Sequence, residues 1–141
     1  RSENSFSYRT VFTMGNWVTN DNSQLILKAG KLIGDYQDIA KPDHIRTMNV
    51  YLPDSRTFDV VIRVNIPNGH HVKNVDDLNI SVNNETGYCK SNATLTGQVL
   101  TWHVSETFLN NFQPASNWSK LAEILDTIYT LSEKEITIEK N

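Results

Sequence analysis

Residues 58–69 read Phe-Asp-Val-Val-Ile-Arg-Val-Asn-Ile-Pro-Asn-Gly and form the clearest predicted strand in the chain. Apolar side chains recur at every second position with mostly polar residues between them, so this strand should have one buried and one solvated face. The apolar set is Phe58, Val60, Ile62, Val64 and Ile66. Pro67 ends the strand because it has no N–H to donate to a sheet, and Asn68-Gly69 predicts a turn.

The segments on both sides of this strand alternate in the same way. Met48, Val50 and Leu52 predict a strand that forms a hairpin with residues 58–66 through the short link 54–56. Further strands are predicted over residues 6–12, 24–28 and 78–82, whereas residues 19–23 read as an exposed polar loop. Residues 35–43 lack a clear period and contain Pro42, so we interpret them as a connection that crosses from one sheet to the other.

A second hairpin is predicted in more detail. Thr96-Gly97-Gln98 turns the chain, and pairing Leu95 with Leu100 places Ala93 opposite Trp102, Ser91 opposite Val104 and Cys89 opposite Glu106. In this register one face collects Cys89, Ala93, Leu95, Leu100, Trp102 and Val104. A slip of one residue would mix apolar and polar side chains on both faces, so the pattern favours this register.

The period becomes helical after Pro114. Ser116 is the predicted N-cap, and the apolar stripe consists of Trp118, Leu121, Ala122, Leu125, Ile128 and Tyr129. Residues 135–140 alternate again and predict a final strand that pairs back into a sheet. Many short strands and one late helix predict a mainly β fold, an antiparallel immunoglobulin-like β-sandwich with the helix against an open end or edge.

Composition limits the classes of function. The 141 residues suit one domain spanning 1–141, and a net charge of -3 without a basic run argues against nucleic-acid partners and a polybasic membrane anchor. No window approaches the ~20 apolar residues of a membrane helix. Cys89 is the single cysteine, so an intrachain disulfide is impossible. The chain begins at Arg1, which fits a processed protein or part of a larger multidomain protein.

The candidate chemical residues favour structural roles. A nucleophilic Cys89 would need an imidazole, but the hairpin register puts His103 on the opposite face of the sheet. His70 and His71 are adjacent and would point to opposite sides of an extended segment, and His44 lacks a partner at ligand spacing. Without a phosphate-binding or metal-binding motif, we predict neither a cofactor nor a metal and assign no catalytic residue.

Trp17 is the one candidate contact residue for a ligand or an interface. Trp102 and Trp118 belong to inward-facing sets, which leaves Trp17 as the tryptophan that could be exposed. Exposed tryptophan rings on a sandwich can stack on sugars. A carbohydrate-binding module is therefore an alternative function.

Several short motifs point to a family. They are Gly30-Lys31-Leu32-Ile33-Gly34, Val50-Tyr51-Leu52-Pro53, Ile66-Pro67-Asn68-Gly69, Val72-Lys73-Asn74, Asp77-Leu78 and Leu95-Thr96-Gly97. Together with the late helix and residues 136–140, this pattern resembles the C-terminal β-domain, a domain of unknown function, of large transglutaminase-like proteins of the Bacteroides group. Such proteins tend to have aromatic residues where His70 and Cys89 stand here.

The resemblance implies a position behind a transglutaminase-like catalytic core, whose own motifs this chain lacks. It also implies an exported setting, in the periplasm or at the cell surface. The leading hypothesis is thus a non-catalytic accessory module that packs on or presents the core. Its partners would be upstream domains of the same polypeptide or another envelope protein, and an independent enzyme is the third alternative.

Overall fold

The computed structural model describes residues 6–39, 45–53 and 55–141. Its large sheet is antiparallel and has the strand order β4-β8-β7-β6, with β4 Arg56–Asn65, β8 Val99–Phe108, β7 Gly87–Thr96 and β6 Ile80–Asn84. A smaller antiparallel sheet has the order β1-β2-β10-β5, with β1 Val18–Asp21, β2 Gln24–Leu27, β10 Ile136–Lys140 and β5 His70–Val72. The remaining strands, β3 Val50–Tyr51 and β9 Phe112–Gln113, pair only with each other.

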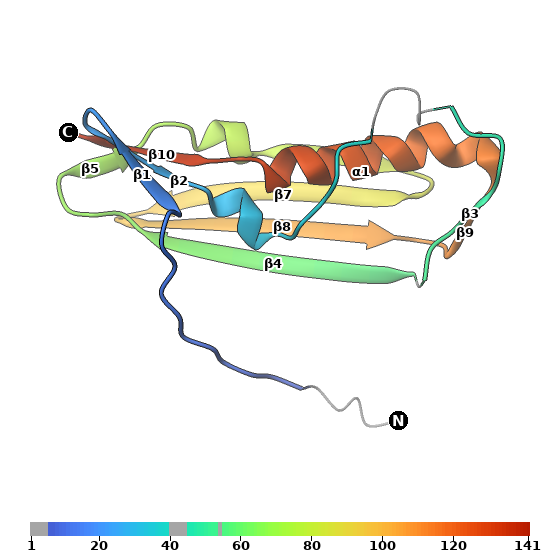
Figure 1. Ribbon diagram of the computed structural model, residues 1–141, viewed down its shortest axis with the longest axis horizontal. Coiled ribbons are helices and arrows are strands. Elements are labelled where there is room, and N and C mark those ends of the chain that lie inside the picture. The colour runs from blue at the N-terminus through green and yellow to red at the C-terminus, as the bar shows by residue number, and fades with distance from the viewer. Residues whose placement is uncertain (1–5, 40–44, 54) are drawn as a thin grey trace.

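The molecule has two layers (Figure 1). One layer is the large sheet, and the other consists of the small sheet and helix α1, Trp118–Ser132, which lie end to end. Short 3-10 helices connect these parts: η1 Ala29–Leu32, η3 Asp76–Leu78 and η4 Ala115–Asn117. The apolar core lies between the layers and includes Ile62, Leu100, Trp102, Ile124, Ile128 and Ile136. The predicted mainly β fold, with sandwich-like packing and one C-terminal helix followed by a strand, is confirmed.

The central strand and the second hairpin follow the sequence prediction. Ile62 and Ile66 are buried and Val60 and Val64 half-buried, whereas Phe58 lies near the strand end and is 42% exposed. In β7 and β8 every predicted pair is found, including Ala93 with Trp102 and Cys89 with Glu106. The register holds because it puts apolar side chains on the core face and His103 on the outer face. Leu95, beside the turn, is the exception and is exposed.

The predicted hairpin between residues 48–52 and β4 is wrong. β3 pairs with β9, and β4 pairs along its whole length with β8. The partner of β4 was therefore about 40 residues further along the chain, beyond the reach of an argument from neighbouring segments. Met48 is exposed.

The predicted strand over residues 6–12 is also wrong. This segment is extended but has no strand partner in the described chain, and Phe6, Tyr8 and Phe12 are 86%, 81% and 63% exposed. Alternation makes a segment suitable for a sheet, but a strand also needs an open edge to pair with. The first strand is β1, which includes Thr19 and Asn20 from the predicted loop. Only Asn22 and Ser23 turn the chain, both with positive φ.

The late helix was predicted correctly in type, but its start differs. The N-cap is Asn117, because η4 occupies the preceding turn and Ser116 lies within it. The helix lies over the face of the large sheet at β7 and at the edge strand β6. Its buried stripe includes Ile124 and Leu131, which widens the apolar face enough to cover a sheet.

The final strand pairs back into a sheet as predicted. β10 lies between β2 and β5, where Ile136 and Ile138 are buried. Of the predicted crossing 35–43, residues 35–39 have neither helix nor strand, and residues 40–43 lie outside the described residues, as does His44.

Candidate functional site

Cys89 and His103 lie on opposite faces of the β7–β8 hairpin, as their positions in the predicted register require. Cys89 is fully buried, and this burial, together with the nearby Glu106 carboxyl, raises the pKa of its thiol to about 12. His103 is exposed, and its Nε2 lies 3.2 Å from Oδ1 of Asp59. The two side chains cannot form a thiol–imidazole pair, because the sheet separates them.

The adjacent His70 and His71 on β5 contact different neighbours. Nδ1 of His70 lies 3.1 Å from the Asn68 carbonyl oxygen, whereas Nδ1 of His71 lies 2.9 Å from Oδ1 of Asn141. Within residues 6–39, 45–53 and 55–141, no three His, Cys, Asp or Glu side chains are grouped so that they could hold a metal ion. The acidic pairs that the sequence contains, Asp35 with Asp38 and Asp76 with Asp77, are exposed.

A small cavity of about 100 Å³ lies against the core face of β4 and β8. Its lining consists of Ile33, Tyr36, Phe58, Val60, Val104 and Glu106. Glu106 is 3% exposed, and the Tyr36 hydroxyl donates a 2.7 Å hydrogen bond to its Oε1. Its Oε2 has no hydrogen-bond partner among the described residues. A buried carboxyl oxygen in this state raises the free energy of the folded protein.

The electrostatics of the cavity follow from burial. Desolvation raises the pKa of Glu106, and the Tyr36 hydrogen bond and the Arg56 guanidinium oppose the rise. Desolvation and the hydrogen bond to Glu106 also raise the pKa of the Tyr36 hydroxyl above its usual range. The other lining residues are the apolar Ile33, Phe58, Val60 and Val104, and the neighbouring Cys89 thiol is held protonated. The arrangement thus resembles a polar pair within a core more than an acid–base site.

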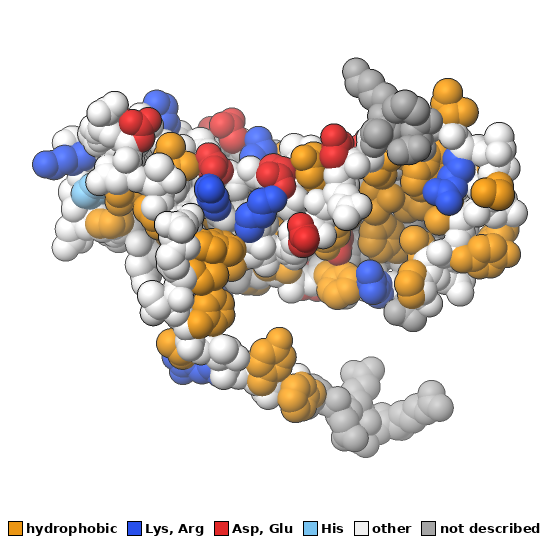
Figure 2. All heavy atoms as spheres, in the orientation of Figure 1, with side chains coloured by type: hydrophobic (Ala, Val, Ile, Leu, Met, Phe, Trp, Pro, Cys, Tyr) orange, Lys and Arg blue, Asp and Glu red, His pale blue; other side chains and the backbone are white. Residues whose placement is uncertain are grey.

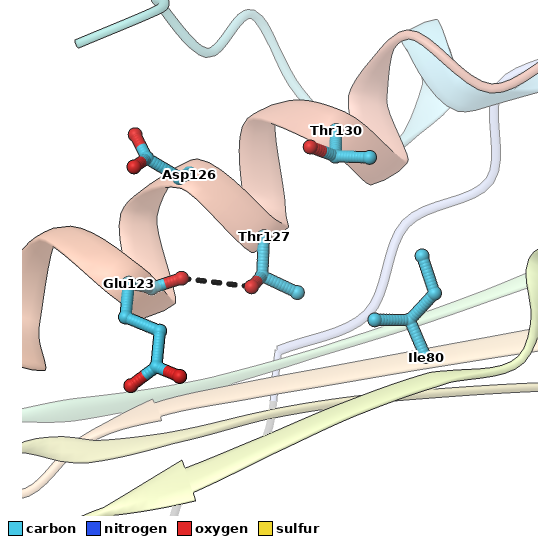
Figure 3. A pocket seen from close by; sticks show the side chains of 5 residues that line it. All are labelled: Ile80, Glu123, Asp126, Thr127 and Thr130. Atoms are coloured by element: carbon cyan, nitrogen blue, oxygen red, sulfur yellow. Dashed lines mark hydrogen bonds between the residues drawn. The ribbon is translucent and has the colours of Figure 1, made fainter. Parts of the chain in front are cut away.

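A larger, open groove of about 360 Å³ lies between α1 and the start of β6. Figure 3 shows Glu123, Thr127 and Thr130 projecting from the helix, with Ile80 below them at the start of β6, whereas Asp126 projects upward, away from Ile80. The Thr127 hydroxyl donates a 2.7 Å hydrogen bond to the Glu123 carbonyl oxygen. At the far end of β6, Nδ2 of Asn84 donates to the Lys120 carbonyl oxygen at 2.9 Å and to Oε2 of Glu123 at 3.2 Å. This bridge fixes the helix to the strand at one end of the groove.

Trp17, the candidate contact residue, is half-buried just before β1, and its carbonyl oxygen accepts a 3.1 Å hydrogen bond from the Lys28 N–H. Trp102 and Trp118 are buried, as predicted, and Nε1 of Trp102 donates to Oγ of Ser91 at 2.7 Å. Trp17 does not line either pocket described above. The structure therefore brings none of the predicted candidates together into one site.

Two groups of exposed apolar side chains stand out instead. One runs along the N-terminal segment, where orange side chains follow the chain away from the body of the molecule in Figure 2. It comprises Phe6, Tyr8, Val11, Phe12 and Met14. The other lies at the β3–β9 end and comprises Ile45, Met48, Tyr51, Leu109 and Phe112, with the Tyr51 and Phe112 rings 5.1 Å apart between centroids. Patches of this kind typically mark surfaces that pack against another protein surface.

Of the hydrogen-bonded pair in the small cavity, sequence reasoning could have found Glu106 but not Tyr36. The predicted register already placed Glu106 opposite Cys89, so a carboxyl at an inward position was a readable signal of a buried polar group. Tyr36 lies in a segment without a period, and no sequence pattern connects it to β8.

Comparison with known proteins gives the fold only. No family model matches the chain, and no curated protein matches it. A crystal structure from Parabacteroides distasonis, described as that of a "putative protease", is similar with a TM-score of 0.66 and 11% sequence identity. The match covers 84% of this chain and 24% of that one, so this chain spans about a quarter of the length of the solved protein. At this identity the likeness shows that the two share a fold.

Proposed function

We propose that this chain is a non-catalytic accessory module at the C-terminal end of a transglutaminase-like cell-envelope protein, and that it packs on the catalytic core of that protein. Another envelope protein is the alternative partner. In this proposal the module is exported, to the periplasm or the cell surface. The resemblance of the strand and turn motifs to the C-terminal β-domain of such proteins motivates the assignment.

The observation that carries the proposal is the exposed aromatic segment at the N-terminus. Phe6, Tyr8 and Phe12 alternate as strand residues do, yet each is more than half exposed in the chain by itself. Burying three aromatic side chains against a partner would be favourable by about 2 kcal/mol each. This segment also leads directly toward any residues that precede Arg1, where an upstream domain would lie.

Two further observations support a non-enzymatic role. The cysteine thiol is buried behind the sheet, and the buried carboxyl faces apolar walls and a tyrosine rather than a nucleophile. The fold likeness is to a quarter of a longer chain, which is the arrangement expected for one module of a larger protein.

The test begins with the gene product, in which a transglutaminase-like core is expected upstream of Arg1. The core and the 141-residue chain are then produced separately, and their affinity is measured by calorimetry. The combined variant Phe6→Ser, Tyr8→Ser and Phe12→Ser should bind at least about tenfold more weakly, since buried aromatic residues dominate interfaces.

The matched control replaces exposed apolar residues outside the segment, Val61→Ser and Leu95→Ser, and should leave the affinity unchanged. A gene product without such a core, or equal loss of affinity in both sets of variants, would contradict the proposal.

A further inference from the structure

The strand β6 forms one edge of the large sheet. β6 is the last strand of the large sheet and pairs with β7 on one side only, so the outward N–H and C=O groups of Ile80–Asn84 have no strand partner among the described residues. Such an edge is a template for one more strand. Residues Ile80, Val82 and Asn84 are half-buried and alternate with the exposed Ser81 and Asn83, so the strand has a defined helix-facing side.

The two edges of this sheet differ in charge. The opposite edge, β4, includes the charged residues Arg56, Asp59 and Arg63. Charged side chains on edge strands discourage pairing with other chains. β6 reads Ile-Ser-Val-Asn-Asn and has no charged side chain, so it lacks this protection. Of the two edges, β6 is the better acceptor for an added strand.

The groove beside β6 has room for a chain and has a chemical preference. Its volume is about 360 Å³, and the helix side presents Glu123, Asp126, Thr127 and Thr130 while β6 presents Ile80 (Figure 3). A strand added to β6 would direct every second side chain toward α1. Those side chains would meet the Glu123 carboxylate and the Thr127 and Thr130 hydroxyls, which favour a lysine or arginine over an acidic residue.

We propose that the edge of β6 and the facing side of α1 bind an extended peptide segment that directs a basic residue toward Glu123, by addition of a strand to the large sheet. The main-chain hydrogen bonds supply affinity, and Glu123 supplies the preference for positive charge. This binding surface is separate from the exposed N-terminal segment, and the inference does not depend on the proposed function.

The probe is a terminally blocked peptide, Thr-Lys-Val-Lys-Val-Lys-Thr, added to the 15N-labelled 141-residue chain. Saturable chemical-shift changes are expected at the amides of residues 80–84 and along α1. The same peptide with Glu in place of Lys should bind about fivefold more weakly, because one exposed charge pair contributes up to about 1 kcal/mol. N-methylation of the interior peptide groups should abolish binding, since it removes the donors that pair with β6.

The variants separate this site from general attraction to a negatively charged protein. Glu123→Gln should weaken binding of the Lys peptide by about threefold. The matched control Glu135→Gln removes one exposed carboxylate outside the groove and should leave binding unchanged. Three results would overturn the proposal: equal binding of the Lys and Glu peptides, shift changes at β4 instead of β6, or concentration-dependent shifts at β6 without peptide, which would mean that a second copy occupies the edge.

Discussion

Glu106 is the residue with the most direct consequence for stability. Its carboxyl is buried between β4 and Tyr36, with one oxygen bonded to the tyrosine and the other without a partner among the described residues. Burial raises its pKa, while Tyr36 and Arg56 favour the charged form. The folded state therefore prefers the protonated carboxyl more than the unfolded chain does.

This preference predicts a pH dependence with a definite sign. From about pH 4.5, the ordinary pKa of the group, up to its raised pKa, the native protein holds a proton that the unfolded chain has released, so the free energy of unfolding falls as pH rises. Glu106→Gln removes this contribution. Relative to the natural protein, the variant should gain stability as pH rises above about 4.5, measured by urea unfolding.

The control for this measurement is Glu135→Gln, which neutralises an exposed carboxyl and should preserve the natural pH profile. If the free energy of unfolding of Glu106→Gln changes with pH in the same way as that of the natural protein over the whole range, the carboxyl is not desolvated as described.

Cys89 should be nearly inert in the folded protein. Its thiol is fully buried, and its pKa of about 12 leaves almost no thiolate at neutral pH. Labelling by a chromogenic disulfide should be at least about a thousandfold slower in the native protein than in urea, because the reagent reaches the thiol only after the structure opens. The rate is followed by absorbance at equal reagent concentration.

The variant His103→Ala should label at the same slow rate, since the imidazole lies across the sheet. Fast, saturable labelling of the native protein that disappears in His103→Ala would contradict a structural role for Cys89.

Among the strands and helices, those with their own internal pattern were predictable. The β7–β8 pairs follow from one tight turn and two strictly alternating strands, because a slip would expose Trp102 and bury His103. The partners of β4 and β3 were not predictable, because they depend on segments distant in the chain rather than on either strand's pattern. The same reason explains residues 6–12, which have strand-like alternation but no edge to pair with in this chain.

The candidate groove could not be predicted from the sequence pattern. Its two sides are β6 and α1, which are separated in the chain by the whole β7–β8 hairpin, and the pattern did not specify which strands the helix would cover. Glu123 lies outside the apolar stripe of α1, but only the packing of α1 on the sheet places it beside an open strand edge. The sequence also did not place Tyr36 against Glu106.

The contact between η1 and the end of α1 gives a prediction about how these elements pack. A Cβ at Gly30 would lie 2.4 Å from the Leu131 carbonyl oxygen, 2.6 Å from that of Ser132 and 2.8 Å from the Lys134 nitrogen. All three are backbone atoms, so Gly30→Ala must move one element away from the other. The expected cost is about 1–3 kcal/mol in the free energy of unfolding, measured with urea.

Gly15→Ala is the matched control, because a Cβ there would meet nothing within 4 Å. This substitution should change the free energy of unfolding by no more than about 0.5 kcal/mol. Equal effects of the two substitutions would show that η1 does not pack closely on the end of α1.

As a whole, the molecule combines a complete core with surfaces that lack a partner. The two layers enclose the apolar side chains of the sheets and of α1, and within the described residues no membrane-spanning helix is found. In contrast, the N-terminal aromatic residues and the β3–β9 end are exposed (Figure 2). This contrast between a filled interior and two open apolar surfaces is what an interaction module requires.

Hydrogen exchange tests the proposed role as a packing module most directly. Backbone exchange is measured by mass spectrometry for the 141-residue chain and for the full-length gene product, with β7 and β8 as internal references. The account predicts that residues 6–14 exchange rapidly in the isolated chain and become protected in the full-length protein, while β7 and β8 are unchanged. Equally rapid exchange of residues 6–14 in both proteins would contradict it.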